Sequence, residues 1–599
     1  MSVRFIDMAL KVGDKTELEI IDNGTDGEGI AKYEGMAVFV PFVLPGETVR
    51  AEITLLKKNF ARAKVIKLLK SSPLRQEPPC PLFRKCGGCD YQHIKYEAQL
   101  EIKRAEVKNC LKKYAGLDVE VGEVVPSKEV LHYRNKVQLP IALFGGKIRA
   151  GFFKEKSHDF IPIEDCLLQG EWAKSFIAAF VEYANESKLT AYDERTQKGL
   201  LRHLVLRKIG DSVNAVVVIN GKSLPNRDNL IQKFKALSIP FNLFYSINTK
   251  NTNVILGETP VCFYGSELAQ TEILGVKTNV SPASFMQVND SVRDLLYQYA
   301  ADAIKEKGCD IVFDVFSGVG ILSNILAKVA DKVYGIEIVK DAVDNANEMA
   351  RSNGNLDKIT NICGDAAVVL PKLVSEIFQS RNGVLNTKPA ANLENNCDIN
   401  LKDKSDNGCD TIIAAKNKLN DNGANSTVDI KTVSDETNKH NDIKSDKKFN
   451  NVEEKNEYNK ASSKDSLNSF DTNSNLNTLS LDKPKSDSNL NALNKPYSDD
   501  FIYQSVSSGI YKKEKSLYNQ NATNCAVVLD PPRKGCDESV LNAILTAKPQ
   551  TVVYISCNPA TLARDLKILS TEYKIDSVTP FDMFPQCAHV ETVVLMSRV

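Results

Sequence analysis

Short apolar runs that alternate with helical segments constrain the fold of this chain most strongly. The runs include CDIVFDVF, KVYGIEI, CAVVLD and TVVYISC, and segments such as DSVRDLLYQYAADAIKEKG show helical periodicity. Apolar strands that alternate with helices are typical of a parallel sheet with helices on both faces. The pattern predicts an α/β domain, in which the last run, VETVVLMSRV, is expected to be an edge strand.

A tract rich in Asn, Ser, Lys and Asp interrupts this pattern. Between residues 391 and 500, 22 of 110 residues are Asn. Such a composition cannot bury enough apolar surface to offset its conformational entropy, and loops tolerate added length at a slowly growing cost. We therefore predict a disordered insert over residues 382–524 and one domain formed by residues 271–381 and 525–599.

The N-terminal half is predicted to be rich in β-structure. Residues 12–70 alternate apolar and polar positions between Gly and Pro, which predicts a small barrel of about five strands, placed at 1–70. Residues 71–270 form a second β-rich region. The barrel's later part carries Phe60 among cations that fit either a solvated strand face or a nucleic-acid surface, namely Lys57, Lys58, Arg62, Lys64, Lys67 and Lys70.

Composition limits the location of the protein and leaves its partner open. The net charge is zero, from 76 basic and 76 acidic residues, so bulk charge neither predicts nor excludes a nucleic-acid partner. There is no apolar run of about 18 residues, which argues against a membrane span. The start, MSVRFIDMALKVGDK, has no signal-peptide pattern, so the 14 cysteines are expected to be reduced in the cytoplasm.

Three cysteines form a C-x5-C-x2-C array at Cys80, Cys86 and Cys89. Cys166, in a short polar break between apolar runs, is the natural candidate for a fourth ligand. Four thiolates hold either zinc or an iron–sulfur cluster, and the spacing does not choose between them. The alternative is that these residues are ordinary buried thiols.

The α/β part contains a candidate cofactor site. Glycines at 318 and 320 follow one strand and allow a ligand to approach the backbone closely. Glu337 ends the next strand, where a carboxylate can bond ribose hydroxyls, and Asp365 follows a third, where it can meet an adenine amino group. NAD and S-adenosylmethionine both fit these features, and either acid could instead cap a helix.

Two further strand ends favour methyl transfer. One strand ends in Asp530-Pro-Pro-Arg, and the next ends at Cys557, so both side chains are expected at the ligand-binding edge of the sheet. A thiolate that adds to C6 of uracil makes C5 nucleophilic enough to attack an electrophilic methyl group. The alternative for Cys557 is a small buried hydrophobe.

The same chemistry requires a base that removes the C5 proton. FPQCAHVE supplies Glu591 and His589 just before the last strand. We assign Glu591 as the base and His589 as the second candidate, because a carboxylate beside a desolvated ring has a raised pKa.

Five motifs in this order resemble the bacterial RNA uracil-5-methyltransferases: SPASFMQVN, DVFSGVG, LDPPRKG, SCNPATLARD and FPQCAHVE. The barrel resembles a TRAM domain. The cysteine array resembles the [4Fe–4S] site of the subgroup that makes 5-methyluridine in 23S ribosomal RNA. The resemblance covers almost the whole chain outside the insert and implies a Rossmann-like, S-adenosylmethionine-dependent methyltransferase domain.

The resemblance also implies roles for individual residues. Cys557 matches the nucleophile and Glu591 the proton acceptor. The positions that match the S-adenosylmethionine pocket are Gln287, Phe316, Glu337, Asp365 and Asp530. Those that match the cluster ligands are Cys80, Cys86, Cys89 and Cys166. Those that resemble RNA-facing segments are Tyr133, Arg134, Asn135, Lys136, Arg202 and His203. Two positions depart from the family pattern, with Ile321 where relatives often have Asn and Cys587 where they often have Thr.

Rival functions remain. The nearest is the same chemistry on the T-loop of transfer RNA, whose enzymes generally lack the barrel and the cluster. A cytosine-5 RNA methyltransferase would also use a cysteine, but the chain shows no Pro-Cys nucleophile motif of that class. A third is a non-catalytic RNA-binding iron–sulfur protein, against which Cys557 and Glu591 argue. We expect a cytoplasmic monomer that acts on 23S ribosomal RNA.

Overall fold

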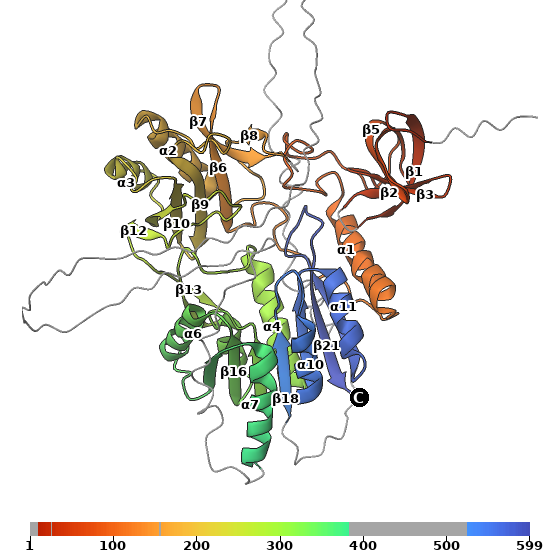
Figure 1. The fold of residues 1–599 in the computed structure, drawn as a ribbon, viewed down its shortest axis with the longest axis vertical. Coiled ribbons are helices and arrows are strands. Elements are labelled where there is room, and N and C mark those ends of the chain that lie inside the picture. Colours follow the sequence, from red (N-terminus) through yellow and green to blue (C-terminus); the bar gives the residue numbers. More distant parts are fainter. Residues whose placement is uncertain (1–9, 25–26, 155–156, 382–523) are drawn as a thin grey trace, which may run out of the picture. The chain divides into compact units, whose positions relative to one another are not determined.

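The computed structural model describes residues 10–24, 27–154, 157–381 and 524–599 (Figure 1). The predicted insert therefore lies outside the described residues, except for Asn524. The predicted N-terminal barrel is confirmed as a closed barrel with the strand order β1-β2-β3-β5-β4. Its strands are β1 (Lys15–Asn23), β2 (Gly29–Tyr33), β3 (Met36–Val40), β4 (Thr48–Leu56) and β5 (Phe60–Lys70).

A helix joins the barrel to a central sheet. Helix α1 (Tyr96–Cys110) continues into a π-helical turn, η1 (Leu111–Ala115). The central sheet has seven strands in the order β12-β11-β10-β9-β6-β7-β8. These strands are β6 (Lys136–Phe144), β7 (Lys147–Phe153), β8 (Phe160–Pro162), β9 (Leu201–Ile209), β10 (Ser212–Ile219), β11 (Phe241–Ile247) and β12 (Val261–Tyr264). Its helices are α2 (Trp172–Glu186) and α3 (Arg227–Lys235), and a hairpin, β13 (Ala269–Ile273) and β14 (Val276–Val280), follows.

The predicted α/β domain is also confirmed, as a second seven-stranded sheet with the order β17-β16-β15-β18-β19-β21-β20. Its strands are β15 (Ile311–Val315), β16 (Lys332–Glu337), β17 (Ile359–Cys363), β18 (Cys525–Leu529), β19 (Thr551–Ser556), β20 (Tyr573–Phe581) and β21 (Glu591–Arg598). Its helices are α4 (Asp290–Glu306), α5 (Ile321–Leu326), α6 (Lys340–Ser352), α7 (Ala366–Arg381), α10 (Glu538–Ala547) and α11 (Pro559–Leu569).

Strands from both sides of the insert share this sheet. Strand β15 pairs in parallel with β16 and also with β18, which follows the insert (Figure 1). Two large groups of buried apolar side chains pack on the two faces of the sheet, because successive residues of a strand point to opposite faces. Val527 and Val528, neighbours in β18, belong to different groups.

The expectation that the last strand is an edge strand is wrong. Strand β21 lies between β19 and β20 and is antiparallel to both, so the edge strand is β20. The first six residues of β21 are all buried, whereas β20 begins with alternating buried and exposed positions. A strand that is buried on both faces has neighbours on both sides, which explains the continuous apolar run.

None of the described helices is long and apolar enough to cross a membrane.

A buried carboxylate ties the barrel to the chain that follows it. Glu47, which is fully buried, accepts hydrogen bonds from Arg75 Nε and Nη2 at 2.6 and 2.7 Å and from the backbone N–H groups of Leu44 and Ser72. Burial by itself raises the pKa of Glu47, but these hydrogen bonds outweigh it and leave the pKa below its usual value.

We predict that Glu47→Gln lowers the free energy of unfolding at pH 7 by about 3 kcal/mol, because it leaves Arg75 without a buried counterion. A depressed pKa stabilises the fold above the unfolded-state pKa, and this contribution disappears as the pH falls through the folded-state pKa. Urea unfolding at several pH values should therefore show that the free energies of unfolding of the wild type and Glu47→Gln differ less below about pH 4.5. Glu52→Gln, at a largely exposed pair with Lys64, is the control. A pH-independent difference for Glu47→Gln would contradict this account.

Candidate active site

The predicted site residues meet at one edge of the α/β sheet. Strands β17, β16, β15, β18 and β19 are parallel, so their carboxyl ends lie at the same edge. The antiparallel strand β21 begins at this edge. In the order of the strands, the side chains along the edge are Asp365, Glu337, Phe316, Asp530, Cys557 and Glu591.

The end of β19 fixes the position of Cys557. Ser556 Oγ accepts a hydrogen bond from the Asn558 N–H at 3.2 Å, and Asn558 Oδ1 accepts from the N–H groups of Ala560 and Thr561. Asn558 is therefore the N-cap of α11, and Pro559 occupies its first turn, where no backbone donor is needed. The partly buried Cys557 lies between a strand and a capped helix, which restricts its backbone.

The strand register places Glu591 next to Cys557. Ser556 pairs with Thr592, so Cys557 and Glu591 extend this ladder by one position at the edge. Glu591 also pairs with Phe581 of β20 and is only 3% exposed. The base and the nucleophile of the sequence prediction are therefore brought together by two adjacent strands.

Burial and mutual repulsion raise the pKa values of this group. Burial raises the pKa of Glu591 to about 8, and the charge of Asp530 adds to the effect. Burial raises the pKa of Asp530 to about 7, with a contribution from Asp314. Burial raises the pKa of the Cys557 thiol to about 12, assisted by the charges of Glu591 and Asp530. Perturbed groups that cluster in this way are typical of catalytic sites.

Three residues of this environment were missed by the sequence analysis. Arg533, in the motif that contains Asp530, lowers the pKa of both Cys557 and Glu591 by its charge. Asp314 is 1% exposed within β15, and burial raises its pKa to about 6. Burial and the charges of Asp530 and Asp314 raise the pKa of Tyr297 in α4. An acid inside the apolar run IVFDV was a signal for Asp314, whereas no local pattern marked Tyr297.

His589 is exposed, unlike Glu591. Arg533 Nη2 lies 2.8 Å from its ring Nε2. The geometry therefore favours Glu591 over His589 as a base that is shielded from water.

The candidate cofactor-binding residues lie at the ends of β15, β16 and β17. Phe316 has a φ of 68°, and Gly318 and Gly320 have φ of 54° and 83°, so the loop after β15 turns repeatedly through the left-handed region. Glu337 Oε2 accepts a hydrogen bond from the Gly318 N–H at 3.1 Å, which ties this loop to the end of β16. Asp365 Oδ1 accepts from the Ala367 N–H in the first turn of α7, which is the capping role considered as an alternative.

Ile321 and Gln287 complete the predicted pocket positions. Ile321 is buried in the apolar core on one face of the sheet. Gln287 is 7% exposed in the segment before α4, and its backbone O accepts a hydrogen bond from Asn135 Nδ2 at 3.0 Å. In the same segment, Asn289 donates to Ser127 and to Met583 O, which connects it to the loop after β20.

Several positions that resemble RNA-facing residues have protein partners instead. Tyr133 is buried, and its hydroxyl donates to Pro585 O. Asn135 is buried against Gln287. Arg202 donates to Asn248 O and Lys250 O and lies 4.5 Å from the ring centre of Tyr192. These side chains support the chain around the site.

The predicted cluster ligands share one cavity. Cys80, Cys86, Cys89 and Cys166 all line a cavity of about 350 Å³. Burial raises the pKa of Cys166 to about 11, and the charges of Cys86 and Cys80 contribute, so these thiols interact through space. In the described part of the chain, however, no three or more His, Cys, Asp or Glu side chains form a group that could hold a metal ion.

The thiol state agrees with the sequence expectation for most of the described cysteines. Eleven of them are free thiols. A fifth cysteine, Cys587, lies beside the predicted ligands. Its Sγ donates to Gly88 O at 3.3 Å, and Arg134 donates to the same sulfur.

The chain matches three protein-family models. They are a tRNA (Uracil-5-)-methyltransferase model over residues 511–599, a TRAM domain model over residues 9–66 and an RNA cap guanine-N2 methyltransferase model over residues 309–394. The crystal structure of Pyrococcus abyssi tRNA (uracil-54, C5)-methyltransferase with S-adenosyl-L-homocysteine is similar in fold. It has a TM-score of 0.58 and 21% identity, with coverage of 97% of this chain and 100% of that one.

Two curated bacterial relatives match over nearly the full length. An uncharacterized RNA methyltransferase of Clostridium tetani is 30% identical over 595 residues, which is 99% of this chain and 98% of the relative. One from Bacillus cereus is 32% identical, over 96% of this chain and 94% of the relative. With the uracil-5 and TRAM models matched at its two ends, the chain belongs to the RNA (uracil-5-)-methyltransferase family.

Proposed function

We propose that this protein transfers a methyl group from S-adenosylmethionine to C5 of a uridine in 23S ribosomal RNA, as a cytoplasmic monomer. Residues 271–381 and 525–599 carry the catalysis, and residues 1–70 and 71–270 bind RNA. The observation that carries the proposal is the adjacency of Cys557 and Glu591 at the sheet edge, beside Asp530. A nucleophile and a base in a shielded site are what the covalent reaction requires.

Cys557 acts first in the proposed mechanism. Its thiol has a pKa of about 12, so it needs a proton acceptor before it attacks. Asp530 and Glu591 are the carboxylates whose charges raise this pKa, and we assign Asp530 as the acceptor of the thiol proton, so that Glu591 stays ionised for the last step. The thiolate then forms a bond to C6 of the uracil, and the electron pair of the C5–C6 double bond moves into an enolate.

Glu591 acts last. S-adenosylmethionine supplies an electrophilic methyl group, which C5 attacks. The ionised Glu591 then takes the C5 proton, the C5–C6 double bond re-forms and the C6–S bond to Cys557 breaks. A base with a pKa of about 8 is close to the working pH, where general-base catalysis is most effective.

The loop after β15 is the candidate S-adenosylmethionine site. Open space surrounds Gly318, whereas Gly320 packs against Ala346. Glu337 ends β16 and Asp365 follows β17 at the same edge. Glu337 accepts two backbone hydrogen bonds and Asp365 accepts one, and both carboxylates keep lone pairs for the cofactor. Phe316 and Gln287 complete the proposed pocket.

RNA is proposed to approach from the barrel and the central region. The cations of β5 and its preceding turn divide into two groups. Arg62 and Lys64 form ion pairs with Glu28 and Glu52, whereas Lys57 and Lys58 are exposed and form no ion pair with a described residue. A cavity of about 610 Å³ beside the 281–289 segment adds cationic and aromatic lining, including Arg134, Lys208 and Trp172. Such surfaces favour phosphate and base contacts.

We propose a [4Fe–4S] cluster held by Cys80, Cys86, Cys89 and Cys166. The support is that these four thiols line one cavity and that four cysteine thiolates are the usual ligands of such a cluster. Bound there, the cluster would cross-link the segment before α1 to the central region.

The T-loop of transfer RNA is the second candidate substrate. The archaeal enzyme named for tRNA uracil 54 has a fold that covers 97% of this chain, so the fold itself does not separate the two substrates. The preference for 23S ribosomal RNA rests on the resemblance of the cysteine array.

We predict that the protein labels unmodified 23S ribosomal RNA as 5-methyluridine when it is given S-adenosylmethionine with a labelled methyl group, and that Cys557→Ala abolishes the label. Transfer RNA is tested in parallel. Label in transfer RNA alone would contradict the assignment of ribosomal RNA as the substrate but would agree with the proposed reaction. No label in either RNA would contradict the proposed function. Cys309→Ala, at a buried cysteine just before β15 and so at the opposite end of the parallel strands, is the matched control.

We predict that Glu591→Gln lowers kcat by a factor of about 10² to 10⁴, because the amide cannot take the C5 proton. In the wild type, activity should rise as the pH increases through about 8, where Glu591 ionises. A raised carboxyl pKa stabilises the fold below the unfolded-state pKa and loses this effect as the pH rises through the folded-state pKa. Glu591→Gln should therefore melt at a higher temperature than the wild type at pH 9, but not at pH 4. Equal melting temperatures at both pH values would contradict the raised pKa.

We predict that Lys57→Ala with Lys58→Ala weakens RNA binding and leaves S-adenosylmethionine binding unchanged. Each lost phosphate contact should reduce the slope of log Kd against log salt by about 0.7 for single-stranded RNA. Lys64→Ala, whose charge is already paired with Glu52, should change the slope less. An unchanged slope in the double variant would contradict the proposal that the barrel binds RNA.

A further inference from the structure

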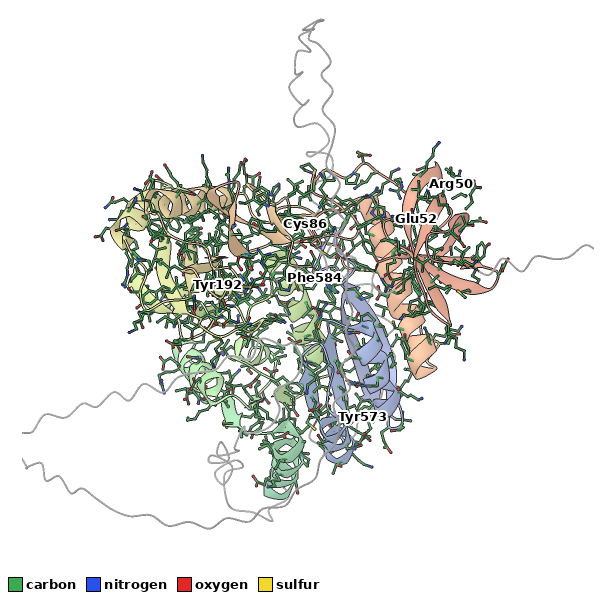
Figure 2. The ribbon with its side chains drawn as sticks, turned by 45° about the horizontal axis from the view of Figure 1, so that its top comes forward. Arg50, Glu52, Cys86, Tyr192, Tyr573 and Phe584 are labelled. Atoms are coloured by element: carbon green, nitrogen blue, oxygen red, sulfur yellow. The ribbon has the colours of Figure 1, made fainter. Side chains whose placement is uncertain are left out.

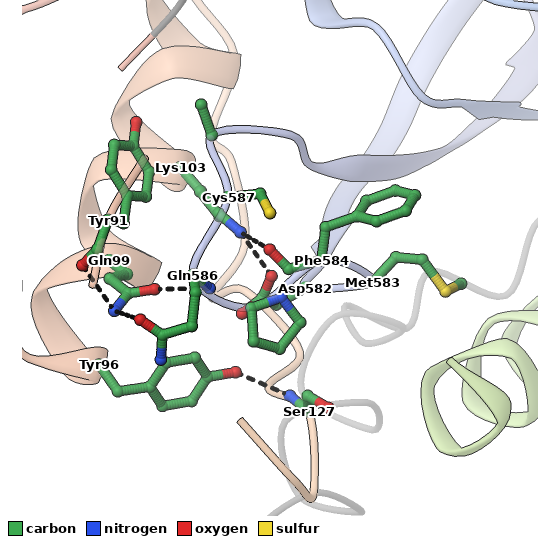
Figure 3. Close-up of polar contacts among 12 residues, drawn as sticks. Tyr91, Tyr96, Gln99, Lys103, Ser127, Asp582, Met583, Phe584, Gln586 and Cys587 are labelled. Carbon is green, nitrogen blue, oxygen red and sulfur yellow. Dashed lines mark hydrogen bonds and ion pairs between the residues drawn. The ribbon is translucent and has the colours of Figure 1, made fainter. Parts of the chain in front are cut away.

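A buried ion pair joins helix α1 to the loop between β20 and β21, residues 582–590. Lys103 Nζ lies 2.5 Å from Asp582 Oδ1 and donates to Phe584 O at 3.0 Å (Figure 3). Neither side chain of the pair is exposed at all. The two residues are 479 positions apart in the chain, and neither belongs to the proposed nucleophile, base or cofactor pocket.

Burial of this ion pair between α1 and the loop is energetically unfavourable. Removing two charges from water costs several kcal/mol each, and apolar side chains of similar volume are often at least as stable. Asp582 Oδ2 is buried and receives no hydrogen bond from any described residue. A stabilising role alone therefore explains the pair poorly, whereas a requirement for one defined loop position explains it.

A second bridge from the same helix holds the middle of the loop. Gln99 Nε2 donates to Gln586 Oε1, and Gln99 Oε1 accepts from the Gln586 N–H, both at 3.1 Å (Figure 3). Gln586 has a φ of 69°, which is uncommon for a residue with a side chain. Strained backbone of this kind persists only where its surroundings fix it, and it is typical of functional sites.

The segment before α1 contacts the same loop. The N–H groups of Asp90 and Tyr91 donate to Gln586 O, and Asp90 Oδ2 accepts from the Ala588 N–H at 2.9 Å. Cys89 and Phe584 belong to one packed apolar group. Figure 2 labels Phe584 of the loop and Cys86 of the segment before α1. The loop is thus held along its length by residues 88–103.

The loop ends at the proposed base. Phe581, the last residue of β20, pairs with Glu591, the first residue of β21, so the loop leaves and returns at the sheet edge. Its conformation sets how the chain enters β21 and where Glu591 begins. Gln99 and Lys103 of helix α1 both bond to this loop, so these two side chains act on the chain that enters β21.

We propose that Lys103, with Gln99 beside it, is a positioning residue that holds the 582–590 loop and so aligns Glu591 for removal of the C5 proton. This inference rests on the proposed function and deepens it. The step affected is the last one. The carboxylate takes the C5 proton, the C5–H electron pair forms the C5–C6 double bond, and the C6–S bond breaks to release the Cys557 thiolate. Addition of Cys557 and methyl transfer precede this step and do not need the base.

The test separates the two halves of the reaction with one variant, Lys103→Met. In RNA that contains 5-fluorouridine, C5 carries no proton, so the methylated adduct persists and its formation reports only addition and methyl transfer. Lys103→Met should form this adduct within about threefold of the wild-type rate, yet methylate ordinary RNA at least about tenfold more slowly. It should also accumulate a denaturant-stable adduct with ordinary uridine RNA, as is expected of Glu591→Gln.

Controls distinguish positioning from stability. Lys108→Met changes an exposed lysine of the same helix and should leave both reactions unchanged. Lys103→Met with Asp582→Leu removes the unpaired charge and should regain the melting temperature but not the rate of adduct resolution. Gln99→Leu, which removes the second bridge and leaves the ion pair intact, should show the same selective defect as Lys103→Met.

Each outcome decides the inference. If the wild type forms no adduct with 5-fluorouridine RNA, the proposed function fails, and this inference fails with it. If the wild type forms the adduct, but Lys103→Met slows both reactions equally or neither, only the positioning role is overturned. Recovery of the full turnover rate in the double variant would show that the ion pair only stabilises the fold.

Discussion

The pairing of β21 with β19 is the interaction on which the rest of the site depends. It places a buried carboxylate, Glu591, beside the thiol of Cys557 at the edge where the parallel strands end. Both groups are wholly or partly buried next to Asp530, which raises the pKa of Glu591 to about 8, a value that suits a base near neutral pH, and raises the pKa of the Cys557 thiol to about 12. The rest of the α/β domain supplies the matching edge for a cofactor.

The N-terminal regions have a structural connection to this site as well as a proposed role in binding RNA. Residues 88–103 hold the loop that leads into Glu591, and Asn135 holds the segment that contains Gln287. The proposed cluster cavity is lined by Cys89 and by Met286 of the segment that contains Gln287, and Cys89 also packs with Phe584 of the loop. A change in the cysteine segment therefore reaches the catalytic edge through a few packed residues, without contact with the substrate.

Strand ends were predictable from sequence because each is marked by a local change in pattern. An apolar run that stops at Asp530 or Cys557 places that residue at the sheet edge once the strands are parallel. The barrel was predictable for the same reason, from alternation between turns. The order of the last two strands in the sheet was not predictable, because an apolar run does not show whether the strand has neighbouring strands on one side or on both. The Lys103–Asp582 pair has no local signal, since its partners are 479 residues apart and each is an ordinary charged residue in sequence.

The most direct test of the central claim is peptide mapping of the covalent complex between the protein and 5-fluorouridine-containing ribosomal RNA in the presence of S-adenosylmethionine. The account predicts that the RNA-derived mass lies on the peptide that contains Cys557, and that the attached base carries an additional methyl group. A modified peptide at another cysteine would contradict the assignment of the nucleophile, and a complex without the methyl group would contradict the assignment of the donor.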